Sequence, residues 1–197
     1  TRLLTGDDSD VSGFSLPGIP SIIVGSNRHI AWGFTNSYGD WADFVRVQWL
    51  DSKQTKYLAS SGTEQTVKVF DEIIKVKGQQ SVSFPVRETV WGPITKTINS
   101  SFSLALLWTA QQPGALNIGL TELAKSQDLD QALLIAEGIG MPGQNLVIGD
   151  KNGRIAWRLT AQMPNRAGGC DKTAPIDPAS GCDWQGWLAG SENPILI

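Results

Sequence analysis

Short runs of β-branched and aromatic residues, separated by turn-forming residues, are the feature that most constrains how this chain folds. The sequence holds 21 glycines and 10 prolines in 197 residues, and many of them fall between these runs. Runs of this kind are typical of β-strands. Strands are predicted at 21–25, 28–34, 43–50, 66–77, 81–88, 102–109, 145–149 and 154–160. The Asp-Lys-Asn-Gly sequence at 150–153 predicts a hairpin between the last two.

Helix is expected in one stretch only, near residues 116–137. Its stronger part is 129–137, where apolar residues recur on one face and Ser126 or Asp128 precedes as an N-cap. Residues 164–194 are rich in Gly and Pro and are expected to be loop-like. Strands followed by a short helical insertion and a further hairpin indicate an α+β fold, predominantly antiparallel. We expect residues 1–197 to form a single, partial domain.

The charge pattern excludes two classes of partner. The net charge is -3 and the Lys and Arg residues do not cluster, so neither nucleic acid nor an anionic membrane surface has a site to bind. No apolar run approaches the ~20 residues that cross a bilayer.

Cysteine and histidine usage limits the chemistry further. Cys170 and Cys182 lie in one loop and either form a disulfide, as suits a periplasmic or secreted protein, or remain free thiols. With no histidine nearby they cannot complete a tetrahedral zinc site. His29, the only histidine, lies in a predicted strand and no Gly-x-Ser-x-Gly sequence accompanies it, so a serine triad is not expected. The Gly-rich 138–143 segment follows a helix and is interpreted as a loop.

A turn between two predicted strands carries oxygen ligands. Asp40, the Ala42 carbonyl and Asp43 could be aimed at one Ca²⁺ ion, which prefers several oxygen ligands. Asp is also common in turns for conformational reasons, so spacing alone leaves both interpretations open. A further acidic stretch is expected to be solvated; it comprises Asp7, Asp8 and Asp10.

Three ordered motifs resemble the penicillin acylase (penicillin amidase) family. They read VSGFSLPGIP at 11–20, GSNRHIAWGFTN at 25–36 and GDWAD at 39–43. Weaker similarities continue with RETVWGPI at 87–94, LLWT at 106–109 and NGRIAW at 152–157. PNR and WQGW, at 164–166 and 184–187, extend the resemblance over nearly the whole chain.

The resemblance implies an N-terminal-nucleophile hydrolase with a four-layer αββα sandwich. Such enzymes are cut from a periplasmic precursor, and the new N-terminal Ser of the large subunit attacks an amide with its own α-amino group as base, whose pKa is about 8. Their substrates are amides with an apolar acyl group, as in β-lactams or acyl-homoserine lactones. This chain is then expected to be an internal fragment of the large subunit, inactive alone, with the rest of that subunit and the small subunit as partners.

The same resemblance assigns roles to particular residues. Asn36 matches the position whose backbone N–H contributes to the oxyanion hole, a role that leaves its side chain free to vary. Val24, Phe34 and Trp108 match acyl-pocket positions, and core packing is the alternative for each. A structural calcium site is implied at Asp40, Ala42 and Asp43, with further ligands elsewhere.

The chain also departs from the family pattern. The nucleophile is expected upstream, and Thr1 lies too close to the 11–20 motif to fill that role. The Asn193-Pro194 pair resembles the start of the segment that leads to a second, side-chain oxyanion donor. Ala161 and Gln162 occupy a position where Gly is usual, which puts the local turn in doubt.

Two other functions remain open at this point. A β-rich binding module, for carbohydrate or another protein, would suit the eight tryptophans. A family member that has lost catalysis would look the same within these residues.

Overall fold

The computed structural model describes residues 2–4, 10–166 and 168–197 and divides the chain into two compact units. Unit 1 comprises Thr1–Trp41, Gln112–Pro164 and Gly186–Ile197, and unit 2 comprises Ala42–Gln111 and Asn165–Gln185. Each unit has its own cluster of buried apolar residues. Thr1, Asp7 and Asp8 lie outside the described residues.

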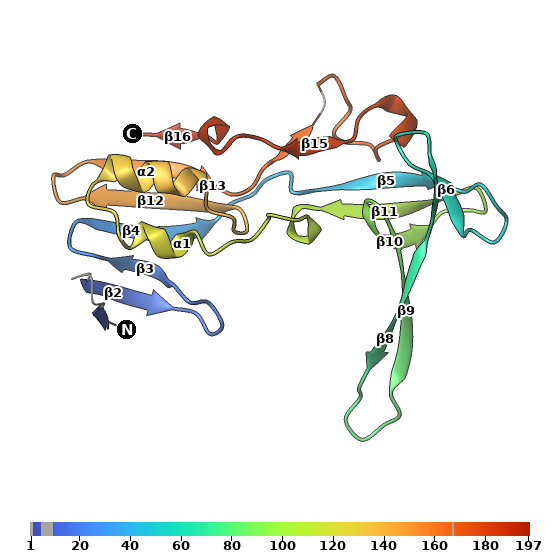
Figure 1. Cartoon of the computed structure of the whole chain (residues 1–197), viewed down its shortest axis with the longest axis horizontal. Helices are drawn as coiled ribbons and strands as arrows, with labels where there is room; N and C mark the ends of the chain where they lie inside the picture. The colour runs from blue at the N-terminus through green and yellow to red at the C-terminus, as the bar shows by residue number, and fades with distance from the viewer. Residues whose placement is uncertain (1, 5–9, 167) are drawn as a thin grey trace. The chain divides into compact units, whose positions relative to one another are not determined.

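Unit 1 is one sheet covered by helices on one face (Figure 1). Its strand order is β1-β2-β3-β4-β12-β13-β16, and every described pairing is antiparallel. The strands are β1 (Arg2–Leu4), β2 (Asp10–Ser15), β3 (Ile22–Ser26), β4 (Ile30–Asn36), β12 (Gln144–Asp150), β13 (Ile155–Thr160) and β16 (Ile195–Leu196).

The helices of unit 1 are α1 (Leu120–Leu123) and α2 (Leu129–Glu137). The Asp128 side chain caps α2 by accepting from the Gln131 N–H at 2.9 Å, as the sequence favours. Leu129, with 0% of its surface exposed, packs in a cluster that also contains Trp32 and Leu146 from the sheet. Because successive side chains of a strand point to opposite faces, every second side chain of β4 and β12 packs in this cluster. This explains why buried and more exposed residues alternate along both strands.

Unit 2 is built on a second sheet of order β5-β11-β10-β9-β8. These strands are β5 (Ala42–Gln48), β8 (Lys68–Ile74), β9 (Val82–Thr89), β10 (Gly92–Thr97) and β11 (Phe102–Trp108). Two short ladders pair β6 (Lys56–Leu58) with β7 (Glu64–Thr66), and β14 (Pro164–Arg166) with β15 (Trp184–Trp187). Single 3₁₀ turns lie at Thr109–Gln111 and Pro178–Ser180 in this unit and at Gly190–Glu192 in unit 1.

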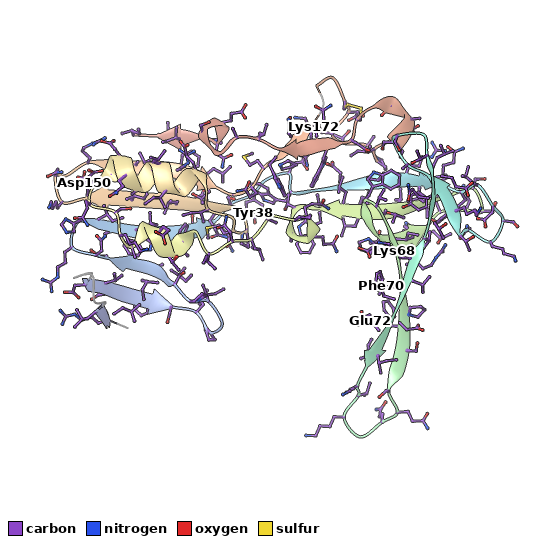
Figure 2. The ribbon with its side chains drawn as sticks, in the orientation of Figure 1. Tyr38, Lys68, Phe70, Glu72, Asp150 and Lys172 are labelled. Carbon is purple, nitrogen blue, oxygen red and sulfur yellow. A yellow bond between two sulfur atoms is a disulfide. The ribbon has the colours of Figure 1, made fainter. Side chains whose placement is uncertain are left out.

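Strands β8 and β9 extend from unit 2 as a two-stranded ribbon, here called the arm (residues 68–88). Strand β9 pairs with β10 only at Glu88 and Thr89, so the arm has no further partner strand among the described residues. Figure 2 shows Lys68, Phe70 and Glu72 in succession along β8. The cross-strand register puts Phe70 and Phe84 on one face, where they are 45% and 57% exposed. A lone two-stranded ribbon is only marginally stable in water. An exposed apolar face of this kind is unusual on the surface of a soluble monomer.

The α+β class predicted from the sequence is confirmed, with mostly antiparallel sheets and two α-helices. Several details differ, and some have a clear local cause. Asp10, expected in a solvated stretch, begins β2 and pairs with Arg2 at 2.8 Å. The strand predicted from 28 begins at Ile30, because the Asn27 side chain accepts the His29 and Ile30 N–H groups and forms a turn. The loop expected at 164–194 contains β14 and β15.

No helix in the described ranges is long and apolar enough to span a membrane.

Candidate functional site

Asn36 is the last residue of β4, and the ladder sets the direction of its backbone N–H. The His29 carbonyl accepts from Lys151 N–H at 2.9 Å, and Ser37 N–H donates to the Gly143 carbonyl at 3.3 Å. Odd-numbered residues of β4 therefore bond to β12. Because an antiparallel strand alternates its bonding direction, the Asn36 N–H and C=O turn away from β12. The β3–β4 pairs are Gly25 with Trp32 and Ser26 with Ala31, so that ladder ends before Asn36.

Two residues of β12 contact Asn36 by their side chains. Gln144 Nε2 donates to Asn36 Oδ1 at 3.1 Å, and Asn145 Nδ2 donates to the Asn36 carbonyl at 3.1 Å. The same Asn145 amide donates to Thr35 Oγ1 at 3.2 Å, and its Oδ1 accepts from Trp157 Nε1 at 3.1 Å. The end of β4 is thus held in a polar network inside unit 1.

The face of the sheet opposite the helices carries an apolar row. The strand register aligns one residue of each strand, from β2 to β16, across this face of the sheet. The central position of the row is a glycine, which has no side chain. From β2 to β16 the row is Phe14, Val24, Gly33, Val147, Trp157 and Leu196. Phe14 is 79% and Leu196 69% exposed. Water-exposed apolar rows of this kind mark surfaces that another layer covers.

The predicted acyl-pocket residues are not brought together in unit 1. Val24 lies in the apolar row, whereas Phe34 packs against the cluster beneath the helices, on the other face of the sheet. The reason is that successive residues of a strand face opposite sides of the sheet. Val24 lies beside Gly33, and Phe34 is the next residue of β4. Trp108 belongs to unit 2, where it ends β11 opposite Ala42 and is 43% exposed.

Of the predicted calcium ligands, Asp40 lies in unit 1 and Ala42 and Asp43 lie in unit 2, where Asp43 meets a guanidinium. Asp43 is buried and its Oδ2 accepts from Arg166 Nε at 2.9 Å and from Trp184 Nε1 at 2.5 Å. Arg166 also lies over the Trp184 ring, at 5.2 Å from the centroid. With its charge paired and one oxygen engaged, Asp43 fits a Ca²⁺ ligand only through its other oxygen. No group of three His, Cys, Asp or Glu side chains is placed for a metal in the part of the chain that the structure describes.

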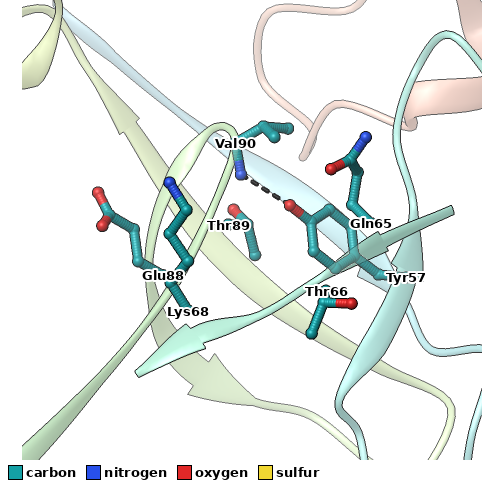
Figure 3. Close-up of a pocket in the computed structure, with 7 residues that line it drawn as sticks. All are labelled: Tyr57, Gln65, Thr66, Lys68, Glu88, Thr89 and Val90. Carbon is teal, nitrogen blue, oxygen red and sulfur yellow. Dashed lines mark hydrogen bonds between the residues drawn. The ribbon is translucent and has the colours of Figure 1, made fainter. Parts of the chain in front are cut away.

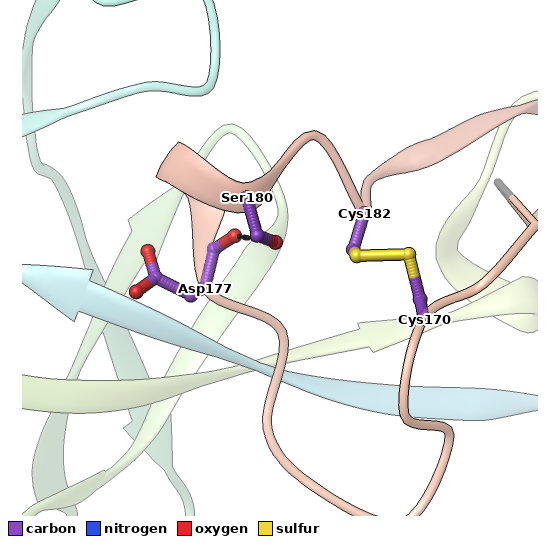
Figure 4. The surroundings of a disulfide bond; sticks show 4 residues. All are labelled: Cys170, Asp177, Ser180 and Cys182. Atoms are coloured by element: carbon purple, nitrogen blue, oxygen red, sulfur yellow. Dashed lines mark hydrogen bonds between the residues drawn. A yellow bond between two sulfur atoms is a disulfide. The ribbon is translucent and has the colours of Figure 1, made fainter.

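A disulfide closes a loop that lies between β14, which carries Arg166, and β15, which carries Trp184. Cys170 and Cys182 are joined across 12 positions of sequence (Figure 4). Within that loop, Asp177 caps a 3₁₀ turn, with its carboxylate accepting from the Ala179 N–H at 3.0 Å. The Ile176 N–H donates to the Phe44 carbonyl at 2.7 Å and so attaches the loop to β5.

A separate groove lies at the base of the arm (Figure 3). It has a volume of about 300 Å³ and is lined by Tyr57, Gln65, Thr66, Lys68, Glu88, Thr89 and Val90. The buried Tyr57 hydroxyl accepts from the Val90 N–H at 2.8 Å, and burial raises the pKa of Tyr57. Lys68 and Glu88 stand opposite each other across the arm. None of the predicted site residues lines it.

Sequence reasoning missed Asn145, Trp157 and Arg166 as site residues. Asn145 stands in a run that predicts a strand, and nothing local marks its side chain as bonded to β4. Arg166 and Trp184 were noted only as parts of motifs, because their partner Asp43 is 123 and 141 positions away. A polar residue inside an apolar strand was the available signal for Asn145, since a half-buried amide needs partners.

Known proteins similar to this chain are acylases. Penicillin G acylase of Escherichia coli is 28% identical over 202 residues, covering 97% of this chain and 23% of that protein. Acyl-homoserine lactone acylase QuiP of Pseudomonas aeruginosa is 26% identical over 198 residues, covering 94% of this chain and 23% of its own length. The chain therefore spans about a quarter of the length of these curated relatives.

A solved structure supports the fold. The thermostable penicillin G acylase from Alcaligenes faecalis superimposes with a TM-score of 0.84 at 22% identity, over 99% of this chain and 36% of that one. The family model for penicillin amidase matches residues 3–197, so this chain belongs to the penicillin amidase family.

Proposed function

We propose that this chain is part of an amide hydrolase that releases an apolar acyl group from a small-molecule amide. The observation that carries the proposal is the Asn36 N–H at the end of β4, turned away from β12. A fixed backbone donor of this kind stabilises the oxyanion that develops as the amide carbonyl is attacked. The attacking group is an N-terminal Ser outside these residues, activated by its own α-amine.

The substrate is an N-acylated β-lactam or an acyl-homoserine lactone. This choice is supported by the printed names of the relatives, which include a penicillin G acylase and acyl-homoserine lactone acylases. Val24, in the exposed apolar row, is proposed to contact the acyl group. The isolated chain, without the nucleophile, is inactive.

The remaining polypeptide of the same precursor is the proposed protein partner. The exposed row that includes Phe14 and Leu196 supports a second sheet covering this face, as the four-layer sandwich requires. A periplasmic or secreted location is supported by the Cys170–Cys182 disulfide, because such bonds persist in oxidising compartments. A structural Ca²⁺ held by Asp40, the Ala42 carbonyl and Asp43 is proposed from the family resemblance. Calorimetric titration of the full-length protein with Ca²⁺ tests it, with Asp43→Asn as the variant that loses binding.

A substitution that removes the N–H alone tests the proposed activity. Asn36→Pro in the full-length enzyme deletes the donor, while Thr35, already extended, tolerates a following proline. We expect kcat for a phenylacetyl or long-chain acyl amide to fall by about 10²–10³-fold. Asn36→Ala keeps the N–H and is the matched control, expected within a few-fold of wild type. Equal activities of the two variants, at equal thermal stability, would contradict the assignment.

A further inference from the structure

The side-chain amide of Asn145 donates two hydrogen bonds and accepts one. Its two N–H groups go to the Asn36 carbonyl at 3.1 Å and Thr35 Oγ1 at 3.2 Å. Its oxygen accepts from Trp157 Nε1 at 3.1 Å. An indole nitrogen is only a donor and a peptide carbonyl only an acceptor, so these neighbours leave one orientation of the amide.

Strand register brings this network together from distant parts of the sequence. Asn145 pairs with Thr35 across the β4–β12 ladder, and Trp157 pairs with Val147, two positions along β12. Side chains two positions apart share a face, so Thr35, Asn145 and Trp157 all lie on the face opposite the helices. The network therefore belongs to the face that carries the apolar row.

The bond to Asn36 acts on the backbone and not on its side chain. In an extended strand the N–H and C=O of one residue point the same way. The Asn36 carbonyl is turned away from β12, and the described contact that holds it is Asn145 Nδ2. Fixing that carbonyl fixes the direction of the Asn36 N–H as well.

We propose that Asn145 is a positioning residue that orients the Asn36 N–H for oxyanion binding, with Trp157 locking the amide in place. The inference rests on the proposed function of Asn36 and adds the group that makes its donor rigid. A preorganised donor stabilises the transition state more than the substrate, because it needs no reorientation when charge develops. Loss of Asn145 then lowers kcat and leaves substrate affinity nearly unchanged.

The test uses the full-length, processed enzyme with Asn145→Asp. Aspartate is isosteric and keeps the acceptor for Trp157 but removes both N–H donors. We expect kcat per titrated active site to fall by about 10–100-fold, as for small misplacements of a catalytic group, with KM within about twofold. Affinity for a boronic acid that forms a tetrahedral adduct should fall in parallel, and affinity for the carboxylic acid product should not. Asn152→Asp, the same change in the β12–β13 turn, is the control and should match wild type.

A second readout does not depend on activity. Amide hydrogen exchange of the peptide that ends at Asn36 should accelerate by about tenfold in Asn145→Asp and not in Asn152→Asp. Trp157→Phe, which removes the indole donor and keeps an aromatic ring, should show a smaller change in the same direction. Unchanged exchange and unchanged kcat per site in Asn145→Asp would overturn the inference. A wild-type enzyme that hydrolyses no acyl amide would overturn the proposed function instead, and the exchange measurement would still decide the positioning role.

Discussion

The buried ion pair between Asp43 and Arg166 offers the sharpest test of how unit 2 is held together. Only 7% of the Asp43 side chain and 14% of the Arg166 side chain is exposed, at an N–O distance of 2.9 Å. For charge centres about 4 Å apart and an effective dielectric constant of about 20, the attraction is about 4 kcal/mol. Desolvation of both groups offsets much of it, so the intact pair adds little net stability.

Removing one partner is different, because the other charge stays buried. Asp43→Asn, which keeps an acceptor for Trp184, should lower the free energy of unfolding of unit 2 by about 3 kcal/mol. Arg166→Met should cost a similar amount. The double variant should lose about 2 kcal/mol less than the sum of the single effects, because neither charge is then left alone.

Urea unfolding followed by hydrogen exchange measures these energies unit by unit. Peptides from β5 and β11 report on unit 2, and a peptide from β12 in unit 1 is the internal reference. Arg46→Met, a change at an exposed arginine on the same strand as Asp43, controls for charge alone and should shift unit 2 by less than about 1 kcal/mol. Additive single effects, within about 0.5 kcal/mol, would refute the coupling.

Three further outcomes are expected. Cys170→Ser with Cys182→Ser should destabilise unit 2 by about 3 kcal/mol in chain-entropy terms, since the closed loop spans 12 positions, and a reductant should then have no additional effect on chemical unfolding. Tyr57→Phe should cost about 1 kcal/mol near neutral pH because the part-buried Val90 N–H loses its acceptor. Burial raises the pKa of the Tyr57 hydroxyl in the folded state. The stabilisation that the neutral hydroxyl gives is therefore complete below the unfolded-state pKa of about 10 and is lost as pH rises through the folded-state pKa. A pH series of unfolding curves should show this loss of stability at alkaline pH in the wild type and not in Tyr57→Phe. The 197-residue chain alone should self-associate through its exposed apolar faces. Phe84→Ser on the arm should lower the association constant measured by sedimentation velocity. An unchanged association constant would place the contact elsewhere.

Local signals carried much of the secondary structure. Helix α2 has the predicted bounds 129–137, and Asp128, one of the two N-caps that the sequence allowed, is the cap, because apolar spacing and a capping side chain act within a few residues. The hairpin at 150–153 likewise joins β12 to β13. Strand β10 and the pair β14–β15 lacked such signals, since short strands in Gly-rich and Pro-rich stretches depend on a partner strand for their definition.

The candidate site was only partly visible in the sequence. The resemblance assigned a role to the backbone N–H of Asn36. The structure shows that this N–H turns away from β12, because the odd-numbered residues of β4 are the ones that bond to β12. The shared pocket expected for Val24 and Phe34 does not form within unit 1, because a strand sends alternate residues to opposite faces. That separation follows from register, which depends on where β3 and β4 align and not on either residue alone.

By itself, the sequence determined the α+β class, the one strong helix, the main hairpin and the family, because strand propensity, capping and ordered motifs are all read along the chain. Only the tertiary structure decided that two cores form, that Asp43 faces Arg166, and that Asn145 holds Asn36. These contacts join residues about a hundred positions apart. Their energies come from burial and hydrogen-bond geometry, and neither exists until the strands are paired.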